Sequence, residues 1–261
     1  MRMKTLLTIL LTAIVFIAAA TLGVTAVYRV SAVTLEVSVV SEEAKTEAEL
    51  LEKALSSRYK KESMFSVKEA WAKEEFAHYP YFRMISFKRS YPNRLIITAT
   101  EDPEVYALEK TDQSGYYILG GDGTVLCERE MPFNRTDGKA NVILTGITVS
   151  ATLGRVPTET AFVSALAFCR TLDGLFGGLR GNVVSLSLNA PVSAPEYSSL
   201  KLIMREGATV NVFNPFNGAE KKAESFYSFY KELGASQRLS GRVDVTDFAL
   251  ENGAFRVTYS V

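Results

Sequence analysis

The chain has few of the residues that acid–base, nucleophilic or metal chemistry requires. Its 261 residues include one histidine, two cysteines and one tryptophan. One histidine cannot make a typical metal site, and His78, just before Pro80, is interpreted as a surface or helix-end residue. No Gly-x-Ser-x-Gly, His-Glu-x-x-His or P-loop pattern occurs. The sequence therefore identifies no catalytic, metal-binding or cofactor-binding residues.

A net charge is also missing. The chain carries 29 Lys and Arg against 29 Asp and Glu, whereas a nucleic-acid-binding protein usually shows a basic excess or a basic face. Disorder is disfavoured because the charges balance and 11% of the residues are aromatic. We therefore expect folded domains and no nucleic-acid partner.

The N-terminal region contains a long uncharged run. Residues 5–27 carry no ionisable side chain, and an apolar helix needs about 20 residues to cross a bilayer. Arg2 and Lys4 precede the run, so the positive-inside rule places residues 1–4 in the cytoplasm and the rest outside. We therefore predict a transmembrane helix over residues 5–27, in the cell membrane. A signal peptide cleaved near Ala26 is the alternative, and both place the bulk of the chain outside the cytoplasm.

Two cysteines lie in this exported part, where a disulfide is permitted. Cys169 shares helical spacing with Phe162 and Leu166, which places it on the apolar face of an expected helix. A buried free thiol is the favoured interpretation of Cys169, and a bridge to Cys127 stays open.

Residues 28–103 have the pattern of a small domain with the order strand, helix, helix, strand, strand. Apolar and polar residues alternate on both sides of the Tyr91-Pro-Asn turn, which indicates a β-hairpin. A three-stranded sheet with both helices on one face would bury the apolar stripes together. The first strand is expected at 34–40, and capping boxes place the helices at 46–59 and 66–79.

Residues 104–261 are expected to form a second, mixed α/β domain with a mainly antiparallel sheet. The glycines of 120–123 lie between two strands, so they indicate a hairpin turn and not a phosphate-binding loop. The fold class is therefore α+β, with a transmembrane helix, a β-α-α-β-β domain and this second domain. The later elements expected in the second domain are strands at 141–144, 183–188, 200–204, 209–213, 242–245 and 254–259, and helices at 157–172 and 219–233.

Acidic residues gather where the two modules meet. Glu101, Asp102 and Glu104 lie at the end of a strand, beside Pro103. A glycosidase needs a pair of carboxylates across a cleft, but solvated acids at a junction are the favoured interpretation. The alternative functions are an exported cell-wall-acting enzyme using Glu101, Asp102 or Asp244, and an extracellular binding protein released by signal cleavage.

The last expected strand is a candidate partner-binding edge. Unpaired backbone groups on such an edge accept a strand from a partner, although an ordinary edge strand without a partner is an equal alternative. On the binding hypothesis, Arg256→Pro or Thr258→Pro is predicted to remove a backbone donor and weaken binding. The candidate residues are Ala254, Phe255, Arg256, Val257, Thr258 and Tyr259.

Several motifs, taken in order, resemble the FtsQ/DivIB family of bacterial cell-division proteins. The hairpin at 86–101 and the following Pro103-Glu-Val-Tyr-Ala resemble the end of that family's POTRA domain and the start of its β domain. Within the β domain the similarity continues through residues 117–125, 207–213, Lys221, Lys222 and 243–245. The similarity covers nearly the whole chain.

Membership would imply a non-enzymatic, single-pass protein of the divisome, located at the division septum and anchored in the lipid bilayer by its N-terminal helix. Residues 28–103 would form the POTRA domain next to the membrane. Residues 104–261 would form the β domain, which binds FtsB/DivIC-like and FtsL-like partners. In the family the terminal strand of the β domain pairs with a partner strand, and this strand corresponds to Ala254–Tyr259.

Overall fold

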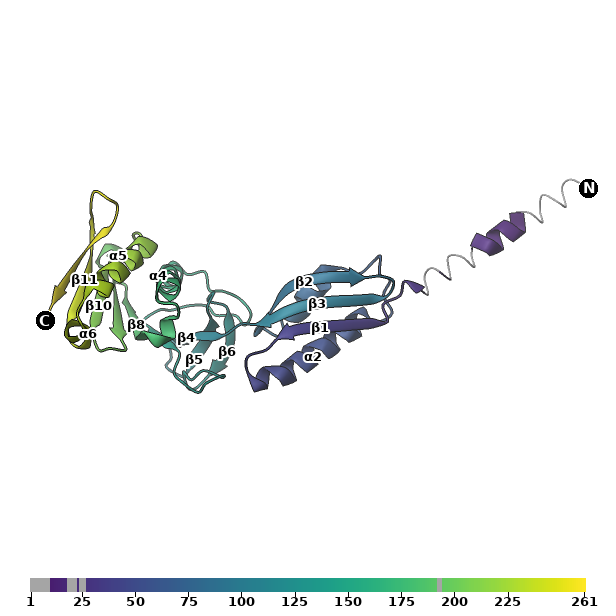
Figure 1. Ribbon diagram of the computed structural model, residues 1–261, viewed down its shortest axis with the longest axis horizontal. Helices are drawn as coiled ribbons and strands as arrows, with labels where there is room; N and C mark the ends of the chain where they lie inside the picture. Colours follow the sequence, from purple (N-terminus) through teal and green to yellow (C-terminus); the bar gives the residue numbers. More distant parts are fainter. Residues whose placement is uncertain (1–9, 18–22, 24–26, 192–193) are drawn as a thin grey trace, which may run out of the picture. The chain divides into compact units, whose positions relative to one another are not determined.

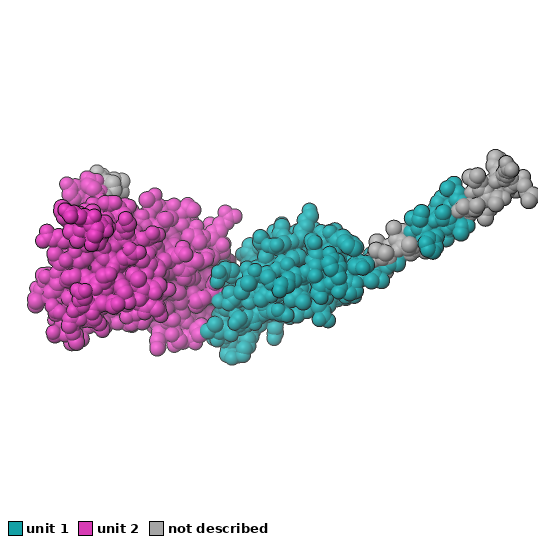
Figure 2. Space-filling model, turned by 45° about the horizontal axis from the view of Figure 1, so that its top comes forward, with its two compact units in different colours: residues 1–101 teal, residues 102–261 magenta. Residues whose placement is uncertain are grey.

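The computed structural model describes residues 10–17, 23, 27–191 and 194–261. The chain divides into two compact units, which Figure 2 colours separately. Unit 1 comprises Met1–Glu101 and unit 2 comprises Asp102–Val261.

The predicted transmembrane helix is wrong. Among the residues that the structure describes, no helix is long and apolar enough to cross a membrane. The described residues of the predicted span, 10–17, 23 and 27, are helical. The rest of the span lies outside the described part, namely residues 5–9, 18–22 and 24–26. The predicted cytoplasmic residues 1–4 lie outside it as well. The fold class is therefore α+β with mixed sheets, without the predicted span.

Unit 1 is a three-stranded sheet with two helices. The strands are β1 (Ala32–Ser38), β2 (Phe82–Ser90) and β3 (Arg94–Glu101), and β3 lies in the middle. It pairs parallel with β1 and antiparallel with β2. The helices α2 (Glu42–Tyr59) and α3 (Glu69–Phe76) lie between β1 and β2 in the sequence, and α2 packs beside β1 (Figure 1).

The start of α2 is fixed by a residue far along the chain. Ser41 is the N-cap, and its Oγ accepts a hydrogen bond from the Ala44 backbone N–H at 3.3 Å. The Glu101 carboxylate, at the end of β3, accepts hydrogen bonds from the Ser41 hydroxyl at 2.6 Å and from the backbone N–H groups of Val40 and Ser41. Glu101 therefore ties the first helix to the central strand.

Unit 2 is built on a nine-stranded mixed sheet in the order β12-β11-β10-β9-β8-β7-β4-β5-β6. Five of its neighbouring pairs are antiparallel, and three are parallel. The strands are β4 (Glu104–Glu109), β5 (Tyr116–Gly120), β6 (Val125–Arg129), β7 (Val142–Thr145), β8 (Val183–Asn189), β9 (Ser199–Met204), β10 (Thr209–Phe213), β11 (Arg242–Ala249) and β12 (Phe255–Ser260).

Two helices of unit 2 pack against each other and share one core with the sheet. They are α4 (Thr160–Phe176) and α5 (Ala219–Glu232). Cys169 of α4 is fully buried, and neither Cys169 nor Cys127 forms a disulfide bond. Burial raises the pKa of the Cys169 thiol, so it behaves as a small apolar side chain. Three short helices complete the unit: Leu179–Gly181, Pro195–Tyr197 and α6 (Ala235–Leu239).

Candidate functional site at the free edge of β12

The strand β12 lies at one end of the nine-stranded sheet. Among the described residues its only strand neighbour is β11, with which it pairs antiparallel. Five of the six predicted site residues, Phe255 to Tyr259, lie in β12, and Ala254 comes directly before it. Figure 1 shows this strand as the yellow ribbon that leads to the C-terminus beside β11. The predicted residues thus form one edge of the sheet.

Two hydrogen bonds decide which backbone groups of β12 face outward. The Arg256 carbonyl accepts from the Thr246 hydroxyl at 3.0 Å, and the Ala254 carbonyl accepts from the Leu250 N–H at 2.7 Å. Both acceptors therefore point toward β11. Because the N–H and C=O of one strand residue point to the same side and the side alternates along the strand, Val257 and Tyr259 direct theirs away from β11. These two residues form the open part of the edge.

This alternation corrects the choice of proline substitutions made from the sequence. Arg256 and Thr258 turn their backbone groups toward β11, where Thr258 pairs with Asp244. Proline at either position would remove a donor from inside the sheet. A proline that removes an outward donor must replace Val257 or Tyr259.

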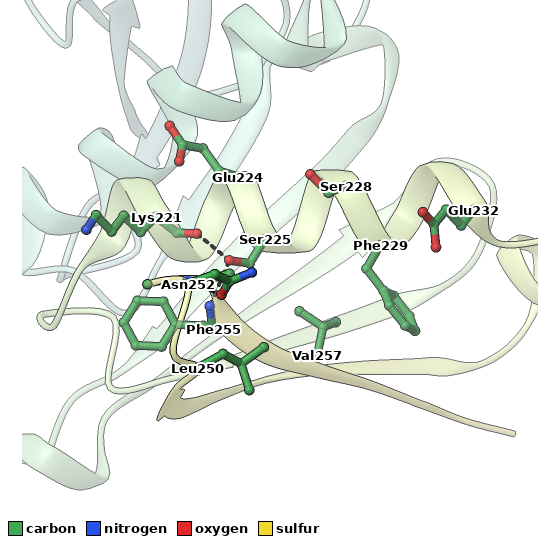
Figure 3. A pocket seen from close by; sticks show the side chains of 12 residues that line it. Lys221, Glu224, Ser225, Ser228, Phe229, Glu232, Leu250, Asn252, Phe255 and Val257 are labelled. Carbon is green, nitrogen blue, oxygen red and sulfur yellow. Dashed lines mark hydrogen bonds between the residues drawn. The ribbon is translucent and has the colours of Figure 1, made fainter.

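The first outward N–H of β12 is already occupied. The Phe255 N–H donates to the Ser225 hydroxyl of α5 at 3.0 Å, and this hydroxyl donates to the Lys221 carbonyl at 2.7 Å, as the dashed lines in Figure 3 show. The helix therefore closes the start of the edge, and the open part begins at Val257.

The side chains of β12 alternate between the core and solvent. Phe255 is buried, and Val257 and Tyr259 are half-buried against the core of unit 2, whereas Arg256 and Thr258 are exposed. The Tyr259 hydroxyl donates to the Ser240 carbonyl at 2.9 Å. The strand is thus held by its core-facing side chains while its outer edge stays open.

A groove of about 600 Å³ lies between α5 and the hairpin that joins β11 to β12. In Figure 3 the α5 side chains stand above it and those of β12 and the hairpin below it. Its wall combines apolar and charged side chains, so a partner strand added to β12 would lie beside apolar and charged side chains of this chain. The lining includes Lys221, Glu224, Phe229, Glu232, Leu250 and Val257.

The hairpin is locked by Lys222, whose side chain is fully buried. Its Nζ donates to the carbonyls of Phe213 and Asn214 at 2.8 and 2.7 Å, and to Asp247 Oδ1 at 2.5 Å. The Nζ also lies 4.6 Å from the centroid of the Phe255 ring. One ammonium group therefore joins α5 to the end of β10, to β11 and to the first residue of β12.

The charges of this pair depend on each other. Burial lowers the pKa of Lys222, although the hydrogen bond and charge of Asp247 act in the opposite direction. Burial alone would raise the pKa of Asp247, but hydrogen bonds from Lys222, Asn214 and Asn217 lower it below the ordinary value. Asp247 is therefore ionised at neutral pH and supplies the counter-charge that a buried ammonium requires.

Of the candidate acids, Glu101 and Asp244 are engaged in structural contacts, as is the nearby Glu104. The expectation that the acids at the junction are solvated is wrong for Glu101 and Glu104, which are buried. Glu101 accepts hydrogen bonds from Ser41, the N-cap of α2, as described above. The buried Glu104 forms a bidentate ion pair with Arg129 at 2.6 and 3.0 Å and also accepts from the Arg135 backbone N–H. Asp244 accepts hydrogen bonds from Asn211 and Arg242. Within the described residues no group of three or more His, Cys, Asp and Glu is arranged to hold a metal ion.

Lys222 was not recognised as a structural residue in the sequence, although a signal was present. It lies four residues before Phe226 and eight before Tyr230, so helical spacing places it on the same face of the helix as these aromatic residues. A lysine in phase with an apolar stripe must bring its charge to a partner. The partner, Asp247, could not be identified because it lies 25 residues further along the chain.

No family model matches the chain, and no curated protein matches it. The resemblance to the FtsQ/DivIB family therefore stays a prediction from its motifs. The open edge of β12 is defined by contacts within unit 2 and does not depend on that resemblance.

Proposed function

We propose that this chain is a non-enzymatic scaffold that binds a partner protein by accepting one of its strands at the open edge of β12. The observation that carries the proposal is the outward direction of the Val257 and Tyr259 backbone groups, inferred from the inward hydrogen bonds of Arg256 and Ala254. The edge is held in place on its inner side by Lys222. A rigid edge suits strand addition because little order has to be gained on binding.

The order of motifs supports a place in the bacterial divisome. On this proposal, residues 28–103 act as a POTRA-like domain and residues 104–261 bind FtsB/DivIC-like and FtsL-like partners. The chain would act outside the cytoplasm at the division septum, by protein–protein contact that links components of septal cell-wall synthesis. A fluorescent fusion that gathers at the division site would support this part, and a uniform distribution would contradict it.

The open edge sets the size of the expected effect. Val257 and Tyr259 together offer two backbone donors and two acceptors, and each hydrogen bond contributes about 1 kcal/mol net. Proline at Val257 removes one donor and places a ring where the partner backbone would lie. Because about 1.4 kcal/mol corresponds to a tenfold change in affinity, we expect Val257→Pro to weaken binding tenfold or more.

The test is the affinity of the folded chain for a purified DivIC-like partner, measured by calorimetry. Val257→Ala is the matched control, because it also removes the branched valine side chain but keeps the outward N–H. It should bind the partner within about threefold of the original chain. Circular dichroism and a thermal melt establish that the variants are folded. Unchanged partner affinity in a folded Val257→Pro variant would show that the partner does not add to this edge.

A further inference from the structure

Three aromatic rings gather at one end of unit 1. Tyr28, Phe65 and Tyr91 have ring centroids 5.1 to 6.2 Å apart. Phe65 is 61% exposed and Tyr91 is 55% exposed, so most of this apolar surface faces solvent. Contiguous exposed apolar surface of this kind marks an interaction site more often than a scattered exposed ring does. We call these three residues the aromatic end.

The aromatic end is preformed by backbone hydrogen bonds between three chain segments. The Met64 N–H donates to the Tyr28 carbonyl at 2.8 Å, and the Val30 N–H donates to the Glu62 carbonyl at 2.8 Å. The Ser31 N–H donates to the Asn93 carbonyl at 2.9 Å, which ties the third segment to the first. The three rings are therefore carried by a fixed framework.

The segments that carry the rings also carry basic side chains. The three segments, residues 28–31, 60–65 and 91–94, contain four basic residues and one acidic residue, Glu62. Glu62 is half-buried, whereas all four basic residues are exposed. The basic residues are Arg29, Lys60, Lys61 and Arg94. The surface thus combines exposed aromatic rings with positive charge.

The chain that leads into the aromatic end is apolar. Residues 5–27, directly before Tyr28, contain no ionisable side chain. In the described part of this run, the large apolar side chains from Leu10 to Ile17 are 56 to 73% exposed. An uncharged, exposed apolar segment joined to a basic aromatic surface is suited to a lipid interface better than to a polar protein surface.

We infer that the aromatic end docks on an anionic phospholipid bilayer. Tyrosine rings have an apolar body and a polar tip and are enriched at the level of the lipid headgroups. Lysine and arginine near the surface are attracted to anionic headgroups, and each adds about fivefold to binding. The docking is interfacial, requires no membrane-spanning helix, and is independent of strand addition at β12.

The apolar run before Tyr28 complicates a simple binding assay, because it can bind vesicles by itself. The experiment therefore measures where the aromatic end lies. The full-length chain carrying Tyr91→Trp is mixed with vesicles of equal parts phosphatidylglycerol and phosphatidylcholine, in which some acyl chains are brominated near the headgroup. Bromine quenches tryptophan fluorescence at short range. The matched control is Tyr197→Trp, at a site that is 74% exposed in unit 2.

We expect strong quenching of the tryptophan introduced at position 91 and little at position 197 or at the native Trp71. Lys60→Gln with Lys61→Gln should lower the affinity for these vesicles about 25-fold, and vesicles of phosphatidylcholine alone should quench less. Phe65→Ser should also reduce the quenching, and because Phe65 is exposed the variant should remain folded.

Equal quenching at positions 91 and 197, or none at 91, would overturn the inference. So would a result in which Phe65→Ser leaves lipid quenching unchanged but weakens binding to a divisome protein, since the aromatic end would then be a protein-binding surface. Failure of this experiment leaves the proposed strand addition untouched, because that proposal concerns unit 2.

Discussion

Replacing Lys222 by methionine tests how the partner-binding edge is held in place. Methionine keeps most of the apolar stem but carries no donor, so the carbonyls of Phe213 and Asn214 and the Asp247 carboxylate lose their shared partner. The cation near the Phe255 ring is lost as well. The substitution therefore removes the polar link between α5 and the hairpin while disturbing the packing little.

The expected loss in the free energy of unfolding depends on how far water can replace the contacts that each group loses. Removing one member of a buried ion pair costs about 3–5 kcal/mol, and a hydrogen bond to a charged group contributes about 1.5–3 kcal/mol. The Asp247 side chain is 37% exposed, so water replaces part of its lost contact, and the lower end of the range applies. We expect Lys222→Met to reduce the free energy of unfolding of unit 2 by about 3 kcal/mol.

Urea denaturation followed by circular dichroism measures this loss. The matched control is Lys221→Met at the neighbouring, exposed position, which should change stability by less than about 0.5 kcal/mol. Partner affinity should also fall in a folded Lys222→Met variant, because Phe255 is the first residue of β12. A loss below about 0.5 kcal/mol for Lys222→Met, or equal losses for both variants, would refute the proposed lock.

Two further outcomes are expected. Because the pKa of Asp247 is lower in the folded state, its ionised form stabilises the fold. This contribution is fully present above the unfolded pKa of about 3.9 and is lost as the pH falls through the folded value. In urea titrations between about pH 5 and pH 2, the free energy of unfolding of Asp247→Asn should therefore fall less than that of the original chain. Gly146→Ala should cost about 3 kcal/mol or more in the same titration at neutral pH, because its Cβ would lie 2.0 Å from the Leu188 carbonyl oxygen at φ +73°, whereas Gly138→Ala, at φ +65° with nothing within 4 Å, should cost only about 1 kcal/mol. Similar losses for the two alanine variants, or an unchanged acid dependence for Asp247→Asn, would contradict these arguments.

Local pattern predicted much of unit 1. The alternation around the Tyr91 turn corresponds to β2 and β3, and alternate residues of β3 are buried as expected. In β2 the expected alternation is wrong, because the pairing is irregular between Met84 and Ser86 and Ile85 is exposed. The start of the first helix was misplaced at Thr46. The helix begins at Glu42, because Ser41 is fixed as its cap by Glu101, a partner 60 residues away.

The error in the N-terminal region has a different origin. Residues 5–27 lack charge, and lack of charge shows that a segment is apolar without showing how long its helices are. Among the described residues of this run, 10–17, 23 and 27, no helix is long and apolar enough to cross a membrane.

The sequence located the strand of the candidate site, but it did not show which backbone groups of that strand are open to a partner. The sequence places Ala254–Tyr259 at the end of unit 2, and period-two alternation indicates which side chains enter the core. Which backbone groups face outward depends on the pairing with β11, and this pairing contains an irregularity between Val245 and Ala249. A bulge leaves no mark in a sequence, so the outward direction of Val257 required the structure.

The contact between Ser225 and Phe255 has a consequence for register. A partner strand that slid toward the hairpin would have to displace the Ser225 hydroxyl from the Phe255 N–H before it could pair there. Backbone groups alone do not fix the register of an added strand, because every two-residue step along an edge offers the same outward donor and acceptor. The Ser225 hydroxyl of α5 therefore limits how far an added strand can slide toward the hairpin, and it restricts the register of the pairing independently of the partner's side chains.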